Sequence, residues 1–254
     1  MISKLRYVHG LSEDAAWTRS IAAERSLGLP VRELWIRHLI DQDPQVAECK
    51  LDPEVDVPAH SFDVLVIQWF TDGALLVDGE GSYEAGDVRV LPARCPSPPW
   101  RSSPDGSRFY VFALGGAASA TLTSPSADPG AGERPQRFRL RDVSWEVMAR
   151  GDHVAPPGQV KAIYSDGRMY FRLLRMDPRC VIGPHSHPGN IVYLMTKGSV
   201  EIPGEGIFRV GDARWAPKNL FYPGEIAGRD GAEFIFVQGE TDGSVSWWGT
   251  DTPQ

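Results

Sequence analysis

Two histidines one residue apart are the residues of this chain that most strongly suggest chemistry. His185 and His187 flank Ser186, and side chains along a β-strand alternate between its two faces, so both imidazoles are expected on one face. Two imidazoles supply part of the common non-haem iron ligand set, which also needs an anionic oxygen. The candidates for a third metal ligand are Tyr222, Asn190, Glu225 and His153.

Three interpretations of this histidine pair stay open on sequence grounds. The first is a metal site with an unusual third ligand. The second is a metal-free pocket in which His185 and His187 act as acid, base or hydrogen-bond donors. The third is a pair of buried structural histidines that bond to backbone or water.

The elements that position these histidines belong to an internal repeat. Residues 41–112 align on residues 166–237 at a constant offset of 125, without a gap. Between 57–100 and 182–225, twelve of 44 positions are identical, where chance would give roughly three. Most of the shared residues are Gly, Pro and Asp, which fix turns. The first copy reads His60-Ser61-Phe62 where the second has both histidines, so metal chemistry is expected only in the second copy.

Short runs rich in β-branched and aromatic residues, separated by turn residues, predict an all-β fold of the sandwich or barrel type. An exception is expected at the N-terminus, where Ser12 can cap a short helix that carries Trp17 and Ile21 on one face and ends at Gly28. The expected organisation is an N-terminal helical arm (1–30), a degenerate first barrel (31–114), a linker (115–136) and a second barrel with the histidine site (137–254).

Composition limits the functional classes. The net charge is −7 and the basic residues are scattered, so no nucleic acid and no membrane surface is expected as a partner. No apolar run approaches the ~18 residues that a membrane helix needs, and the three cysteines form no Cys-x-x-Cys pair. These features favour a cytoplasmic protein. The apolar arm around Trp17 and the tail Trp247-Trp248 favour a homodimer.

Two linked patterns in the second copy resemble those of the cupin superfamily. The first runs from Gly183 through His185 and His187 to Gly198, and the second runs from Gly211-Asp212 through Pro217 to Tyr222. The resemblance covers both halves and implies a bicupin: two tandem jelly-roll-type barrels. The superfamily includes dioxygenases, isomerases, decarboxylases, cyclases, sensors and storage proteins, so it leaves function open.

Departures from the cupin pattern concern the metal ligands. Where cupins usually place a metal-binding Glu, this chain has Ile191 beside Asn190, and the usual histidine of the second motif is Tyr222. The resemblance therefore implies a divalent metal (Fe, Zn, Mn or Ni) held by His185 and His187, with the Tyr222 phenol pointing into the pocket. Tyr193 is expected on the same inward face as the histidines.

The leading functional hypothesis is an enzyme that acts on a small organic substrate by metal-assisted oxygenase or enol/β-diketone chemistry. It is loosely supported by a resemblance of 157–176 to the cupin branch that contains acetylacetone and dihydroxyacetophenone dioxygenases and an anti-sigma-factor zinc domain. Tyr222, Tyr193 and Asn190 are its candidate catalytic residues. The alternatives are a non-catalytic ligand-binding or sensory protein and a metal-free isomerase or cyclase.

Overall fold

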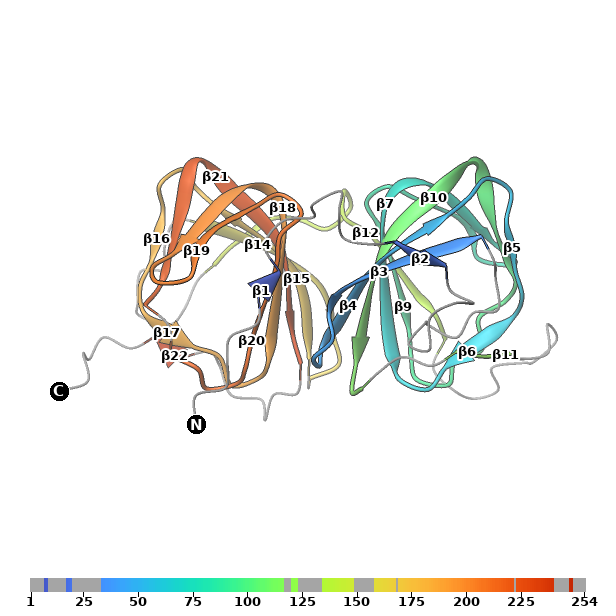
Figure 1. The fold of residues 1–254 in the computed structure, drawn as a ribbon, viewed down its shortest axis with the longest axis horizontal. Helices are drawn as coiled ribbons and strands as arrows, with labels where there is room; N and C mark the ends of the chain where they lie inside the picture. Colours follow the sequence, from blue (N-terminus) through green and yellow to red (C-terminus); the bar gives the residue numbers. More distant parts are fainter. Residues whose placement is uncertain are drawn as a thin grey trace. The chain divides into compact units, whose positions relative to one another are not determined.

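The chain consists of two compact units, each built around one large antiparallel sheet (Figure 1). The computed structural model describes residues 7–8, 17–19, 33–116, 120–122, 134–148, 158–167, 169–221, 223–239 and 247–248. The first-copy unit comprises Ala15–Asp142, and the second-copy unit comprises Met1–Asp14 together with Val143–Gln254. All regular elements of the described residues are strands, so the predicted all-β architecture is confirmed. In these residues no helix is long and apolar enough to cross a membrane.

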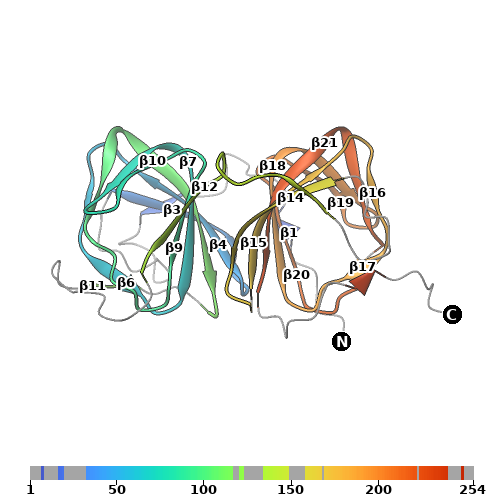
Figure 2. The same cartoon turned by 180° about the vertical axis from the view of Figure 1, so that it is seen from behind.

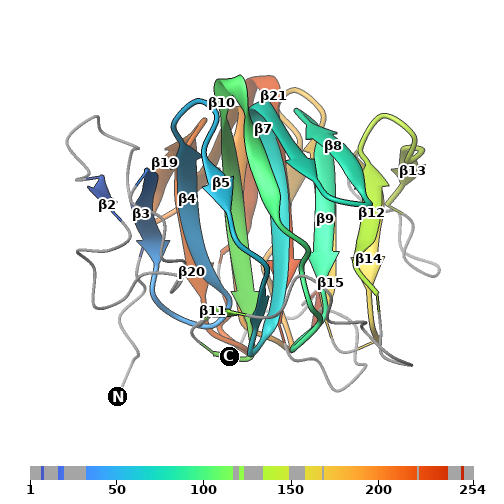
Figure 3. The same ribbon diagram turned by 90° about the vertical axis from the view of Figure 1, so that its right-hand side faces the viewer.

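The sheet of the first-copy unit has its strands in the order β12-β9-β7-β10-β4-β3-β2 (Figure 3). The bounds of these strands are β2 Thr18–Arg19, β3 Leu34–Ile40, β4 Gln45–Leu51, β7 Leu65–Val77, β9 Asp87–Leu91, β10 Trp100–Leu114 and β12 Gln136–Arg139. Shorter strands extend it: β5 (Asp56–Val57) pairs with β10 and β8 (Gly81–Glu84) pairs with β7. The first-copy histidine lies on β6 (His60–Phe62), which pairs with β11 (Ala120–Leu122).

The second-copy unit repeats this arrangement in the order β1-β20-β18-β21-β15-β14-β13 (Figure 2). The bounds are β1 Tyr7–Val8, β13 Glu146–Val147, β14 Gly158–Ser165, β15 Tyr170–Met176, β18 Ile191–Ile202, β20 Ala213–Ala216 and β21 Glu225–Gln238. Two short strands, β16 (Val181–Ile182) and β19 (Gly206–Arg209), pair with β21 and β18. The histidine strand β17 (His185–Ser186) pairs with β22 (Trp247–Trp248).

Glycines kept in both copies allow the long strands to bend. Gly73 and Gly198 have φ values of +63° and +65°, a region that favours glycine. A Cβ atom at Gly73 would lie 2.2 Å from the Gly106 carbonyl oxygen, and one at Gly198 would lie 2.0 Å from the Gly231 oxygen. The repeat therefore preserves the points where two strand backbones approach too closely for any side chain.

Each unit has its own apolar core inside the curved sheet. The first core contains Phe62, Phe70, Tyr83, Trp100 and Phe109 among its buried aromatic residues. The second core instead contains several smaller or flexible side chains, including the buried Met176, Met195, Ala227 and Ala232. The two cores are therefore filled by different side chains at equivalent positions of the repeat.

The N-terminal segment differs from the sequence-based expectation. The described part of the segment expected to be a helix, residues 17–19, is extended, and Thr18–Arg19 pairs with Trp35 and Ile36 of β3. The Arg19 guanidinium lies 4.6 Å from the centre of the Trp35 ring, so tertiary pairing overrides the local helical pattern there. Ser12, Ile21 and Gly28 lie outside the described residues.

Each sheet is completed by a strand from outside its repeat. Tyr7–Val8 pairs with Arg214 and Ala213 of β20, and Gln136–Arg139 pairs with β9 of the first-copy unit. Within the expected linker, Ala120–Leu122 pairs with the histidine strand β6. The expected division into 31–114 and 137–254 stays a prediction.

Candidate functional site

The two histidines of the second copy lie side by side inside the second-copy unit. His185 is 2% exposed and His187 is 7% exposed. Their ring centres are 4.9 Å apart and the ring planes are nearly perpendicular, at 83°. The backbone of this motif is held on one side by β22, through the pairs His185–Trp248 and Ser186–Trp247.

A backbone carbonyl sets the tautomer of His185. The Nδ1 atom of His185 lies 2.8 Å from the Gly183 carbonyl oxygen. Because a carbonyl oxygen only accepts hydrogen bonds, Nδ1 must carry the proton, and Nε2 keeps its lone pair. Metal-binding histidines commonly have this arrangement, in which the second ring nitrogen donates to a backbone oxygen.

Tyr193 contacts the second histidine. Its hydroxyl oxygen lies 3.4 Å from Nε2 of His187, and its ring packs against Phe234 at 4.9 Å and Phe236 at 5.6 Å between ring centres. The guanidinium carbon of Arg214 lies 5.5 Å from the centre of the Tyr193 ring. The structure therefore brings Tyr193 and His187 together, as the strand alternation predicted.

Arg214, which stands at the position of Arg89 in the first copy, is a buried cation. It is 1% exposed, and its Nε and Nη2 atoms donate to the two carboxylate oxygens of Glu205 at 2.7 Å each. A bidentate pair of this kind fixes the guanidinium plane. Arg214 and Glu205 thus form a rigid polar support for the ring of Tyr193.

Glu225 is a buried carboxylate at the start of β21. It is 2% exposed, and its Oε1 atom has no hydrogen-bond partner among the described residues. The thiol of Cys180 lies near enough that its pKa is raised, first by burial and then by Asp177 and Glu225. Burying a carboxylate oxygen without a partner is costly, so a cation or a donor group is the partner it lacks.

The repeat relates Glu225 to the histidine motif. The offset of 125 equates Glu225 with Trp100 and His185 with His60. In the first-copy unit the rings of Trp100 and His60 are in contact, with centres 5.4 Å apart. The alignment could have singled out this Trp-to-Glu replacement, but sequence reasoning treated Glu225 only as one of four candidate third ligands.

The remaining candidate residues take other positions. The side-chain oxygen of Asn190 accepts a hydrogen bond from the Lys218 backbone nitrogen at 2.9 Å, so it braces the loop after β20. Ile191, where cupins usually carry an acidic ligand, is 1% exposed and belongs to the core. Tyr222 and His153 lie outside the described residues.

The fit of a metal ion to these donors is partial. No three His, Cys, Asp or Glu side chains of the described residues are grouped closely enough to hold one. The described residues supply two imidazoles, one of which has its tautomer set for ligation, and one buried carboxylate oxygen that lacks a partner. These donors suit a divalent cation in chemical type, and a complete site needs Glu225 or an undescribed residue to approach the histidines.

The equivalent region of the first-copy unit is filled by apolar and paired side chains. His60 packs against Phe62 and Trp100, with ring centres 5.1 and 5.4 Å apart. Ser97, at the position of Tyr222, accepts a hydrogen bond from Arg89 at 3.0 Å. Burial lowers the pKa of His60 to about 4, even though the carbonyl of Pro58 favours its charged form. This histidine is therefore neutral at pH 7.

Solved structures share the duplicated fold. A candidate dioxygenase from Nostoc punctiforme is 16% identical, with a TM-score of 0.77 over 100% of this chain and 89% of that chain. A single-residue variant of oxalate decarboxylase from Bacillus subtilis is 12% identical, with a TM-score of 0.60 over 94% of this chain and 78% of that chain. Vicilin from hazelnut, Corylus avellana, is 11% identical, with a TM-score of 0.57 over 86% of this chain and 84% of that chain.

These likenesses show that the chain has a duplicated cupin fold. No family model and no curated protein sequence matches it.

Proposed function

We propose that the second-copy unit binds a divalent metal ion and a small organic substrate, and that the first-copy unit is a structural partner. One observation carries this proposal. Phe62 and Trp100, two aromatic side chains that fill the first-copy unit beside His60, are replaced by His187 and Glu225 at the equivalent positions of the second copy. The second copy therefore has groups that can bind cations where the first copy has apolar side chains.

In this proposal His185 and His187 hold the metal, and Glu225 would supply the anionic third ligand after its carboxylate approaches the histidines, because these three described side chains are not grouped closely enough to hold an ion as they stand. The proton on Nδ1 of His185 leaves Nε2 as the ligating atom. A metal ion bound here would polarise a carbonyl or enolate oxygen of the substrate as a Lewis acid. The carboxylate of Glu225 would then gain a partner for its Oε1 atom, which has none among the described residues.

The surrounding residues would orient the substrate. The phenol of Tyr193, 3.4 Å from His187, can donate a hydrogen bond to an oxygen bound beside the histidines. Phe234 and Phe236 line the same wall and exclude water from it. An apolar wall with few polar groups suits a small, flat organic substrate, such as an enol or β-diketone. We also propose Tyr222 and Asn190 as further residues of this site.

The proteins with the same fold support a metal-dependent enzyme in a general way. One is described as a candidate dioxygenase. A second structure of oxalate decarboxylase from Bacillus subtilis is described as having Mn(II) centres. Either oxygenase or enol chemistry fits the proposed site, with Fe, Zn, Mn or Ni as the metal.

A second candidate function rests on the His187–Tyr193 contact alone. A neutral imidazole and a phenol at 3.4 Å can relay a proton, which is the requirement of a metal-free isomerase or cyclase. This alternative needs no third ligand and leaves Glu225 as a second acid or base.

Metal analysis of protein purified without a histidine tag tests both candidates. After reconstitution with Fe, Zn, Mn or Ni, the wild type should retain about one ion per chain, as expected for a three-ligand site. His185→Ala/His187→Ala should abolish binding, and Glu225→Gln should weaken it at least about tenfold. The matched control is His60→Ala, which should bind like the wild type. If the wild type retains none of the four metals, the metal proposal is wrong and the proton-relay alternative takes its place.

A further inference from the structure

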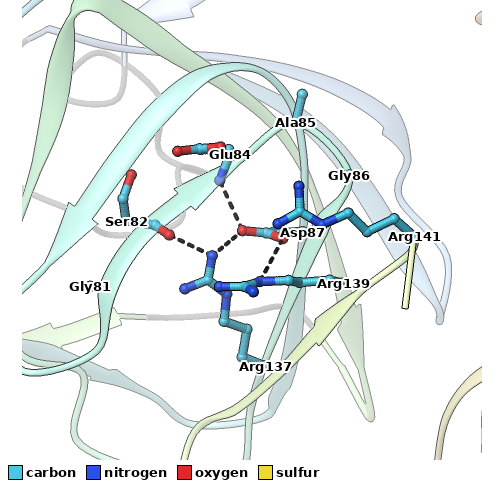
Figure 4. Close-up of a pocket in the computed structure, with 9 residues that line it drawn as sticks. All are labelled: Gly81, Ser82, Glu84, Ala85, Gly86, Asp87, Arg137, Arg139 and Arg141. Atoms are coloured by element: carbon cyan, nitrogen blue, oxygen red, sulfur yellow. Dashed lines mark hydrogen bonds and ion pairs between the residues drawn. The ribbon is translucent and has the colours of Figure 1, made fainter. Parts of the chain in front are cut away.

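A pocket of about 430 Å³ lies on the first-copy unit, away from its filled core. Its floor is formed by β8 and the turn that leads to Asp87, the first residue of β9. Its wall carries Arg137 and Arg139 of β12, and Arg141 follows just after this strand. Figure 4 shows all three arginine side chains pointing toward Asp87. Its volume is within the range of small-molecule sites.

One of the three guanidinium groups is fixed by the protein. Arg137 donates through Nη2 to the Ser82 carbonyl at 2.5 Å and to the carboxylate of Asp87. Its guanidinium also lies 4.5 Å from the centre of the Tyr83 ring. Asp87 in turn accepts a hydrogen bond from the Glu84 backbone nitrogen at 3.1 Å. This part of the pocket is therefore rigid.

The other two guanidinium groups have few constraints. Arg139 reaches Asp87 only at 3.9 Å, which is an ion-pair distance without a hydrogen bond. Arg141 lies 3.9 Å from Asp142, and both side chains are mostly exposed, so water screens that pair. The residues that line the pocket include three arginines and two acidic residues, Glu84 and Asp87, so the lining has one more positive than negative charge. A third carboxylate, that of Asp142, lies beside Arg141 in an exposed position.

The second copy shows that the scaffold does not require these arginines. Its equivalent turn is also capped by an aspartate, with Asp212 accepting from the Arg209 backbone nitrogen at 2.7 Å. At the positions of Ser82 and Ala85, however, it carries Ile207 and Val210, which are 41% and 61% exposed. The strand paired there is Tyr7–Val8, where the first copy has Arg137 and Phe138. Among the described residues, the strand that pairs beside the second turn therefore carries no arginine, and the arginine of the turn itself, Arg209, stands at the position of Glu84.

We propose that this pocket binds a small oxyanion, a carboxylate or phosphate group, through Arg139 and Arg141. Guanidinium groups present paired N–H donors that match such anions. Arg137, in the wall, and Asp87, in the floor, hold each other and do not need to move. The proposal concerns the first-copy unit and is independent of the metal site proposed for the second.

An NMR titration with inorganic phosphate and, separately, succinate tests the proposal, with sodium chloride used to keep the ionic strength constant. The backbone amides from Gly81 to Asp87 should shift to saturation. Arg139→Gln/Arg141→Gln should weaken binding at least about tenfold, because it removes charge-assisted hydrogen bonds. Glu84→Gln should strengthen binding about two- to threefold, because it removes an opposing exposed charge.

Arg101→Gln is the matched control, since Arg101 is an exposed arginine of the same unit that pairs with Asp56 at 2.6 Å, outside the pocket. It should bind like the wild type. Saturation by phosphate alone assigns a phosphate group as the ligand, saturation by succinate alone assigns a carboxylate, and saturation by both assigns a general oxyanion site. Shifts that stay linear with both anions, or equal affinity in the Arg139/Arg141 double variant, would overturn the proposal.

Discussion

Replacing His60 with glutamine should remove a pH-dependent part of the stability of the first-copy unit. His60 has no exposed surface, and its Nε2 atom has no hydrogen-bond partner among the described residues. Burial has the largest effect on the pKa of His60 and lowers it. The hydrogen bond to the Pro58 carbonyl opposes this shift, and the positive charge of Arg89 adds to it. A proton added at Nε2 would therefore place a charge beside Phe62 and Trp100.

The magnitude follows from the pKa of about 4 in the folded chain against the ordinary histidine pKa of 6.5. In the unfolded chain His60 takes up its proton below pH 6.5, whereas the folded chain resists protonation until about pH 4. The free energy of unfolding is therefore highest above pH 6.5 and falls as the pH falls toward 4. Linkage gives a loss of about 2 kcal/mol between pH 7 and pH 5, and about 3 kcal/mol when the transition is complete.

The assay has two parts. NMR titration of the imidazole carbons should show His60 titrating near pH 4, with the signal identified by its absence in His60→Gln. Denaturant unfolding at pH 7 and pH 5, followed by tryptophan fluorescence, should give a pH difference that is about 2 kcal/mol smaller in His60→Gln than in the wild type. Glutamine suits this test because its amide can still donate to the carbonyl of Pro58. Titration of His60 at pH 6 or above, or an unchanged pH difference in the variant, would refute the reasoning.

Three further predictions concern the second-copy unit. Gly198→Ala should destabilise it by at least about 3 kcal/mol, because the new Cβ would lie 2.0 Å from a backbone oxygen. The control Gly204→Ala, whose Cβ would have nothing within 4 Å, should cost only about 1 to 2 kcal/mol of backbone strain. Equal costs in denaturant unfolding would contradict the clash. Glu205→Gln should cost about 3 to 5 kcal/mol, because it removes the charge that the buried guanidinium of Arg214 pairs with. Glu80→Gln should cost less, because the Glu80 side chain is 18% exposed against 6% for Glu205, so water can replace more of the lost interaction; the reverse order in thermal unfolding would be evidence against this. Tyr193→Phe should change stability by less than about 1.5 kcal/mol, since the ring contacts stay. It should, however, shift the imidazole nitrogen resonances of His187, whose Nε2 atom the hydroxyl approaches; unchanged resonances would mean that their contact is not a hydrogen bond.

The duplicated β fold was predictable because its determinants are local. Gly73 and Gly198, the Asp of each turn, and the alternation of apolar residues recur at one offset. The alternation also placed Tyr193 beside the histidines, where its hydroxyl approaches His187. Patterns of this kind survive without knowledge of the tertiary structure, because each residue specifies its own backbone geometry or its own face of a strand.

Other features depend on partners that are distant in sequence and were missed for that reason. The segment around Thr18 has helical spacing but pairs as a strand with β3. The pairing of β1 with β20 joins residues that no local pattern relates. The burial of Glu225, which pairs with Ile182 of β16, could be anticipated only by comparing the two copies position by position. Localisation in the cytoplasm and formation of a homodimer stay predictions.

The pairing of Tyr7–Val8 with β20 also has a consequence for the order of events during synthesis. About 205 residues separate the two paired segments along the chain, so the ribosome makes the second roughly 10 to 40 s after the first. During that interval the unit from Ala15 to Asp142 is already complete and can fold, while Tyr7–Val8 has no strand to pair with. Synthesis therefore favours a sequence in which the middle of the chain folds first, and the earliest strand is captured last.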